Sequence, residues 1–296
     1  MTWKITTLNL GWVELSRRRM IHNASGDGLV RVPVQSWLLS QGGQHVVIDT
    51  GFRSPEVFTG LGDGARGVRD PENTLEQQLL MHGVKPAEVS HVLHTHLHLD
   101  HAGQTEIFPN STVAVVNRKE LEYSVSGLSG PSYPPDDIKH FIDRLHTPNA
   151  LMLLDLELTE GETILPGIRC APANGHTEGS MLIFVDSDEG LACFCGDVVY
   201  SVFYQIQSMN LLTRDPKVSA NTVLSRRTEK AALKRIVNAA PRFKLFPSHD
   251  DPVWIADGAI EAGQLGHADA ADGFKTGCWC RLLESPAAGL FTKANP

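Results

Sequence analysis

A cluster of metal-capable side chains follows an apolar run in the first half of the chain. Five of the eight residues from His94 to His101 can bind a metal ion: His94, His96, His98, Asp100 and His101. The apolar run Val89–Leu93 before them predicts a buried strand. Histidines two residues apart on extended backbone point to the same side, and a loop after the strand can bring the last two residues back towards them. Imidazoles with a carboxylate suit zinc, and also manganese, iron or cobalt. The spacing predicts a metal site.

Three further ligand candidates lie where predicted strands meet loops. They are His176 after the run Ile168–Pro172, Asp197 at the end of Leu191–Cys195, and His249 at the end of Phe243–Phe246. Alone, each of them would be read as a polar loop residue, and Gly-Asp is a common turn dipeptide. Since the three or four ligands of one metal rarely come from a single loop, we expect these residues to complete the cluster.

Together these motifs resemble those of the metallo-β-lactamase superfamily. The similarity runs from about Val32 to Asp250 and includes Asp49 in Val47-Ile48-Asp49-Thr50-Gly51. It implies two metal ions per chain, with Asp49 orienting a ligand imidazole through its other nitrogen. The implied ligands are His96, His98 and His176 for the first ion, Asp100, His101 and His249 for the second, and Asp197 for both. His94 has no role in the resemblance, and we predict a core or supporting histidine.

Hydrophobic periodicity indicates the elements that position these residues. Val34–Leu39 and His45–Ile48 predict two strands joined by a hairpin turn at Gln41–Gln44. Helical spacing predicts helices at Thr74–His82 and Glu229–Ala240, and further helices are predicted at Arg118–Ser124 and Asp136–Arg144. Further strands are predicted at Val89–Leu93 and Thr112–Val116, and three strands between Ile164 and Asp197.

This pattern by itself supports only a mixed α and β fold. The resemblance implies the α/β (α+β) class with a four-layer αββα sandwich. We expect a single metallo-β-lactamase-like domain over residues 1–296, with a C-terminal extension at about 254–296 that packs on the domain or mediates dimerisation. The connection Ser201–Arg227 is long enough to be a lid or pocket wall.

The amino-acid composition and net charge limit which kinds of molecule the protein can bind. The hydrophobic fraction of 42% and charged fraction of 20% are ordinary for a soluble globular protein. The net charge of −8 argues against a nucleic-acid ligand. No apolar run approaches membrane-spanning length, and no apolar signal-peptide core is present, so we expect a cytoplasmic protein without a membrane partner. The odd number of cysteines predicts reduced, buried thiols: Cys170, Cys193, Cys195, Cys278 and Cys280.

Within the superfamily, the chain is most similar to the N-acyl homoserine lactonases. Val32–Leu39, which leads towards Asp49, matches their entry strands, and the metal motif ends in Ala102-Gly103 as theirs does. Tyr200 stands three residues after Asp197, where these lactonases carry a tyrosine that faces the substrate carbonyl. The alternative is that Tyr200 is a strand-end aromatic with its hydroxyl at the surface.

The lactonase resemblance implies a mechanism and a substrate class. A hydroxide bridging two divalent ions, most simply Zn²⁺, would attack a lactone or ester carbonyl. Tyr200 would polarise the carbonyl oxygen, and Asp100 would pass a proton to the leaving oxygen. The activity would be quorum quenching, in which small-molecule N-acyl homoserine lactones are opened. The chain could form a homodimer.

Two alternative functions remain open at this point. The same metal chemistry could act on another lactone, an aryl ester or a phosphotriester, because specificity lies in loops. A thiol or persulfide dioxygenase on this fold would hold one iron, and the full second ligand set argues against it. For the acyl side of the substrate pocket we expect apolar residues of the variable segments, although half or more of them could instead fill the core. They are Met20, Ile21, Phe52, Phe58, Phe203, Tyr204 and Ile206.

Overall fold

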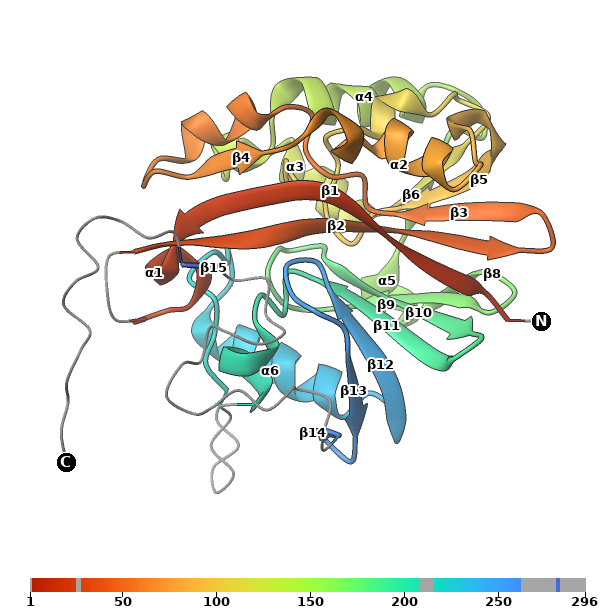
Figure 1. The fold of residues 1–296 in the computed structure, drawn as a ribbon. Coiled ribbons are helices and arrows are strands. Elements are labelled where there is room, and N and C mark those ends of the chain that lie inside the picture. The colour runs from red at the N-terminus through yellow and green to blue at the C-terminus, as the bar shows by residue number, and fades with distance from the viewer. Residues whose placement is uncertain (1, 25–27, 208–215, 262–280, 283–296) are drawn as a thin grey trace, which may run out of the picture.

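A computed structural model describes residues 2–24, 28–207, 216–261 and 281–282 (Figure 1). The strands form two large sheets that pack face to face, and helices cover the outer faces. The expected four-layer αββα sandwich is therefore confirmed. Most residues of the C-terminal extension lie outside the residues that the structure describes.

The first sheet has the strand order β4-β1-β2-β3-β5-β6-β7, and β15 pairs with β2 beside this path. It mixes antiparallel pairs at its N-terminal strands with parallel pairs from β3 to β7. Its strands are β1 (Lys4–Ser16), β2 (Leu29–Gln41), β3 (Gln44–Ile48), β4 (Arg66–Val68), β5 (Val89–Leu93), β6 (Val113–Asn117), β7 (Leu151–Leu154) and β15 (Arg281–Leu282).

The second sheet has the order β14-β13-β12-β11-β10-β9-β8. Only β11 and β12 pair in parallel, so their carboxyl ends lie at the same edge of this sheet. Its strands are β8 (Glu162–Leu165), β9 (Ile168–Pro172), β10 (Met181–Ser187), β11 (Gly190–Gly196), β12 (Arg242–Pro247), β13 (Val253–Ala256) and β14 (Ala259–Ile260).

Helices α2 (Leu75–Met81), α3 (Arg118–Ser124) and α4 (Pro135–Leu145) cover the first sheet, and α6 (Arg226–Val237) covers the second (Figure 1). The hydroxyls of Thr74 and Ser225 accept backbone N–H groups at the starts of α2 and α6, which fixes where these helices begin. The shorter helical segments are α1 (Arg17–Met20), η1 (Pro55–Leu61), η2 (Pro71–Asn73), η3 (Pro86–Glu88), η4 (Thr105–Ile107), η5 (Gly130–Ser132), α5 (Leu156–Thr159) and the π-helical η6 (Phe203–Gln207).

Aromatic side chains fill the space between the two sheets. The ring of Trp37 on β2 lies 4.9 Å from that of Phe194 on β11 and 6.3 Å from that of Phe246 on β12. All three side chains are buried. Strands β2 and β11 are buried along most of their length, because the opposite sheet covers one face and other elements cover the other.

Most of the predicted elements are confirmed within a few residues. β5 and α3 have the predicted bounds, and β2 and β3 form the predicted hairpin. The region from Ile164 to Asp197 was expected to hold three strands but holds four, because the short strand β8 adds to the edge of the sheet. Strand β1 was not predicted, since a bulge at Gly11 (φ 104°) interrupts its alternation.

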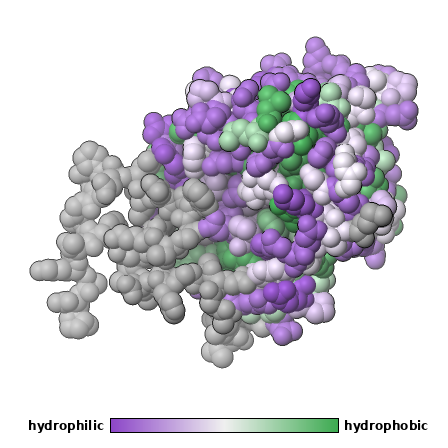
Figure 2. Space-filling model, turned by 45° about the vertical axis from the view of Figure 1, so that its right-hand side comes forward, coloured by the Kyte–Doolittle hydropathy of each residue, from purple (hydrophilic) through white to green (hydrophobic). Residues whose placement is uncertain are grey.

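The face drawn in Figure 2 is mainly hydrophilic, with smaller apolar areas between polar ones. Among the described residues, no helix is long and apolar enough to cross a membrane. The described cysteines Cys170, Cys193 and Cys195 are free and buried, as expected, whereas Cys278 and Cys280 lie outside the described residues.

Candidate metal centre

Four strand ends bring the predicted ligands to one place. His96 and His98 lie in the loop after β5, and His176 lies in the loop between β9 and β10. Asp197 and His249 directly follow the parallel neighbours β11 and β12. The ligands form two groups, and within each group the ligand atoms lie within 4.8 Å of one another. The first group is His96, His98, His176 and Asp197. The second group is Asp100, His101 and His249.

In the first group three imidazole nitrogens converge. Nε2 of His176 lies 3.1 Å from Nε2 of His96 and 3.0 Å from Nδ1 of His98. Oδ2 of Asp197 lies 3.6 Å from the same His176 nitrogen and 3.9 Å from Nε2 of His96. This set of three nitrogens and one carboxylate oxygen is the donor set that zinc prefers.

In the second group the other oxygen of the same carboxylate faces two imidazoles. Oδ1 of Asp197 lies 3.0 Å from Nε2 of His101 and 3.2 Å from Nε2 of His249. The carboxylate oxygens of Asp100 lie 3.8 Å and 3.6 Å from these two nitrogens. Asp197 therefore stands between the groups, with one oxygen towards each.

Hydrogen bonds on the far side of the second-group imidazoles fix which nitrogen faces the site. Nδ1 of His101 bonds to Oδ2 of Asp49 at 2.9 Å, and Nδ1 of His249 donates to the carbonyl of Pro33 at 2.7 Å. Both Nε2 atoms and Oδ1 of Asp197 are buried and have no hydrogen-bond partner within the described part of the chain. Buried, unpartnered nitrogen and oxygen atoms that converge so closely are suited to share one cation, so the residues fit a bound metal ion.

The pKa values of the imidazoles shift in opposite directions in the two groups. Burial lowers the pKa of His96 and His98 well below the usual value, and lowers that of His176 to about 4. These imidazoles are neutral at pH 7 and offer lone pairs to a metal. Burial also acts to lower the pKa of His101 and His249, but the neighbouring carboxylates, with Asp197 foremost, together outweigh it and raise both.

Asp49 has the supporting position that the sequence predicts. Besides bonding to His101, it accepts the Thr95 backbone N–H at 2.8 Å and the Thr95 hydroxyl at 2.7 Å. His94 bonds to the Thr105 hydroxyl at 2.8 Å and packs against Phe141, so it is a core histidine outside both groups.

Two buried carboxylates that the sequence analysis did not single out hold the ligand loops. Glu229 on α6 accepts the backbone N–H of His176 and, at 2.8 Å, the hydroxyl of Thr222. Those bonds hold His176 in a left-handed conformation (φ 68°), which is uncommon for a residue with a side chain. Glu120 on α3 accepts hydrogen bonds from both histidine loops. No local pattern marks either residue, because each is simply a helical glutamate.

Tyr200 lies in the site with its ring buried, rather than with its hydroxyl at the surface. Its ring stacks on that of His249, with the centroids 5.1 Å apart and the planes 15° apart. Its hydroxyl oxygen accepts a hydrogen bond from Nδ2 of Asn221 at 2.7 Å, a partner that the sequence did not reveal. Burial, with the charges of Asp197 and Asp100, raises the pKa of Tyr200, so that its hydroxyl keeps its proton.

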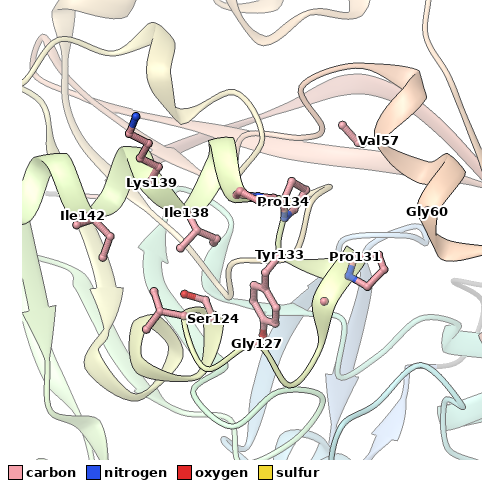
Figure 3. Close-up of a pocket in the computed structure, with 13 residues that line it drawn as sticks. Val57, Gly60, Ser124, Gly127, Pro131, Tyr133, Pro134, Ile138, Lys139 and Ile142 are labelled. Atoms are coloured by element: carbon pink, nitrogen blue, oxygen red, sulfur yellow. The ribbon is translucent and has the colours of Figure 1, made fainter.

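Figure 3 shows an apolar pocket that shares Tyr133 with the surroundings of the first group. Its cavity of about 730 Å³ is lined by η1, η5, α4 and the end of α3. Tyr133 lines the pocket and also packs on His98, with the ring centroids 4.9 Å apart. None of the apolar residues predicted for the substrate pocket lines this cavity.

Five of the seven apolar residues expected to line the substrate pocket pack in hydrophobic clusters of the core. The side chains of Met20, Ile21, Phe52, Phe58 and Ile206 are buried in the hydrophobic core. Phe203 and Tyr204 remain partly exposed on η6. Burial depends on packing between distant elements, which the local sequence does not report.

Comparison with known proteins decides the family. The sequence model of the metallo-beta-lactamase superfamily matches residues 29–234, which include all but one of the ligand candidates. The chain belongs to the metallo-beta-lactamase superfamily. This assignment agrees with the αββα sandwich and with the strand-end placement of the two groups.

Curated relatives from this superfamily are N-acyl homoserine lactonases. The lactonase AttM of Rhizobium radiobacter is 36% identical over 115 residues, which cover 35% of this chain and 43% of that protein. The match thus spans less than half the length of AttM. The N-acyl homoserine lactonase of Bacillus cereus is 25% identical over 207 residues, which cover 67% of this chain and 76% of the relative.

Solved structures of metallo-beta-lactamase proteins share the fold. An N-acyl homoserine lactone hydrolase with the product N-hexanoyl-L-homoserine bound at its metal centre aligns with a TM-score of 0.65 at 19% identity, over 84% of this chain and 94% of that chain. A probable metal-dependent hydrolase from Staphylococcus aureus aligns with a TM-score of 0.68 at 19% identity, over 88% and 96%. At these identities the likeness concerns the fold alone.

Proposed function

We propose that the protein is a dinuclear metallohydrolase that opens lactone rings, with N-acyl homoserine lactones as its substrate class. The observation that carries this proposal is the position of Asp197 between two complete ligand groups. The names of the curated relatives support the substrate class. When bound, two divalent ions supply Lewis acidity for a carbonyl oxygen and activate water for attack.

In this proposal Tyr200 supplies a hydrogen bond to the substrate. Asn221 donates to the phenol oxygen, so Tyr200 keeps its own hydrogen as a donor on the side of Asp197. A donor directed at the carbonyl oxygen helps most when negative charge develops there in the transition state. Ring opening then needs a proton on the leaving oxygen. We assign its delivery to Asp100, the partly exposed carboxylate of the two groups.

The apolar pocket is the proposed site for the acyl chain. Tyr133 lines this pocket and packs on His98, and the lining is mostly apolar. Each methylene that an acyl chain buries there contributes roughly 0.8 kcal/mol. Val125, which lines the pocket and is 55% exposed, provides a variant that leaves the core intact: Val125→Glu.

The test is a substrate panel with metal-loaded protein and measured metal content. We expect about two ions per chain, turnover of N-acyl homoserine lactones, and kcat/KM that rises with acyl-chain length. Val125→Glu should flatten that rise and leave short-chain turnover unchanged. Turnover of phosphotriesters or aryl esters without lactone opening would overturn the substrate class. If the protein instead bound one iron ion per chain and oxidised a thiol, the proposed hydrolytic reaction would be overturned as well.

A further inference from the structure

Glu120 is a buried carboxylate outside both ligand groups, on α3, with 1% of its surface exposed. It accepts four hydrogen bonds. Oε1 accepts the backbone N–H of Leu97 at 2.9 Å and the hydroxyl of Tyr133 at 2.9 Å. Oε2 accepts the hydroxyl of Thr177 at 2.6 Å and the backbone N–H of Gly179 at 3.2 Å.

The four donors all belong to segments that carry or contact the first-group imidazoles. Leu97 lies between His96 and His98, and Thr177 directly follows His176. Tyr133 packs its ring on that of His98. One loop follows β5 of the first sheet and the other follows β9 of the second, so Glu120 joins loops from opposite sheets.

Close packing holds Glu120 against the second of these loops. A Cβ atom added at Gly179 would lie 2.0 Å from the backbone nitrogen of Glu120 and 2.4 Å from its Cα. Only a glycine lets the loop approach α3 this closely. The backbone of α3 at Glu120 therefore contacts the loop that contains Gly179, and the Glu120 carboxylate bonds to the same loop.

We propose that Glu120 is a positioning residue that sets the spacing of the three first-group imidazoles and so preorganises that half of the metal centre. The inference rests on the metal binding in the proposed function, and it is independent of the substrate. Its geometric basis is that a single rigid acceptor fixes the backbone beside His96, His98 and His176 at once. Partners of this kind typically change metal affinity by about 10–100-fold when they are removed.

Glu120→Gln is the informative variant because it keeps the shape and changes the donor pattern. The amide NH₂ group cannot accept a hydrogen bond. The hydroxyls of Tyr133 and Thr177 can rotate, but the N–H groups of Leu97 and Gly179 cannot. At least one of these backbone N–H groups then faces the amide NH₂, and the two loops lose their common acceptor.

Glu14→Gln is the matched control. Glu14 on β1 is also fully buried, and it bonds to Arg31 and Arg66, away from the ligand loops. We expect Glu14→Gln to lower the thermal stability of the metal-free protein and to leave its metal affinity unchanged. A role for Glu120 in stability alone would make the two variants behave alike.

The experiment measures Zn²⁺ affinity by chelator competition and the absorption spectrum of the Co²⁺-loaded protein. The affinity and the spectrum are compared between the single variant His249→Ala and the double variant Glu120→Gln/His249→Ala. The His249→Ala change weakens the second group, so the measurement reports on the first group. We expect Glu120→Gln to weaken Zn²⁺ binding about 10–100-fold and to change the Co²⁺ spectrum. Tyr133→Phe, which removes one of four donors, should weaken it less, and it serves as the test if Glu120→Gln does not fold.

Two results would overturn the inference: unchanged Zn²⁺ affinity and Co²⁺ spectrum in Glu120→Gln and Tyr133→Phe, or an equal loss of affinity in Glu14→Gln. Failure of the proposed function gives a different result. In that case the unaltered protein would itself bind fewer than two ions or open no lactone, whatever residue stands at position 120.

Discussion

The two ligand groups differ in how firmly the protein holds them. In the first group every side chain is buried, and buried glutamates on α3 and α6 tie its loops to the helices. In the second group the side chain of Asp100 keeps 13% of its surface exposed. One bond to Asp49 orients His101, and one bond to the carbonyl of Pro33 orients His249.

This difference suggests a division of labour between the two halves of the centre. A ligand set that is fixed before the metal arrives loses little conformational freedom on binding, whereas a partly exposed set exchanges its ion more easily. If the proposed function holds, we expect the first group to keep its ion more firmly. We expect the second group, where Asp100 is partly exposed, to exchange its ion more easily.

The largest effect is expected where the two groups meet. Asp197→Asn keeps the size of the side chain and removes the carboxylate that faces both groups. We expect binding of both ions to fail and kcat/KM to fall by more than the roughly 100-fold typical of an outer partner. Metal analysis and kinetics measure this, with circular dichroism to verify folding. Retention of two ions would contradict the bridging position.

Removing one histidine from each group tests the asymmetry directly. His249→Ala should retain about one ion per chain, because the first group is complete without it. His176→Ala should retain less than one, since the second group alone holds its ion less firmly. Elemental analysis after dialysis against a chelator measures both. Equal loss in the two variants would show that the halves are equally strong.

Tyr200 tests whether the open side of the centre carries the chemistry. Tyr200→Phe should keep both ions and lower kcat by about 10–1,000-fold, near or below the range for one oxyanion donor. Asn221→Ala, which removes only the bond to the phenol oxygen, should have a smaller effect. Unchanged kinetics in Tyr200→Phe would make this residue a packing aromatic.

A buried carboxylate remote from both groups gives the smallest expected effect and a reference for them. Burial raises the pKa of Asp137 to about 6, against the opposing effect of Arg53. The folded state thus holds this proton more tightly than the unfolded state, so its contribution to stability is complete below about pH 4 and is lost as the pH rises through 6.

Asp137→Asn removes this titration. The unfolding free energy of the wild type should fall relative to that of the variant by about 1–2 kcal/mol between pH 4 and pH 7, after allowance for the partly exposed Arg53. Denaturant unfolding of the metal-free proteins at several pH values measures it. A difference that does not change with pH would show that Asp137 titrates normally.

Local pattern predicted those parts of the molecule whose structure is itself local. The strand β5 and the helix α3 have the predicted bounds, because an apolar run and a short helical segment each carry their own signal. The short edge strand β8 and the bulged strand β1 carry weaker signals. In β1, Gly11 breaks the alternation at the bulge, and the strand is completed only by its pairing with β2.

The sequence by itself determined the identities of the ligand candidates, since metal chemistry restricts them to a few residue types at the ends of apolar runs. Only the tertiary structure decided which oxygen of Asp197 faces which group, and which helix supports each loop. It also decided that Met20 and Phe52 fill the core and that Glu120 bonds to Leu97 and Thr177. A buried carboxylate finds its partners through the packing of segments far apart in the chain, and no local pattern records that packing.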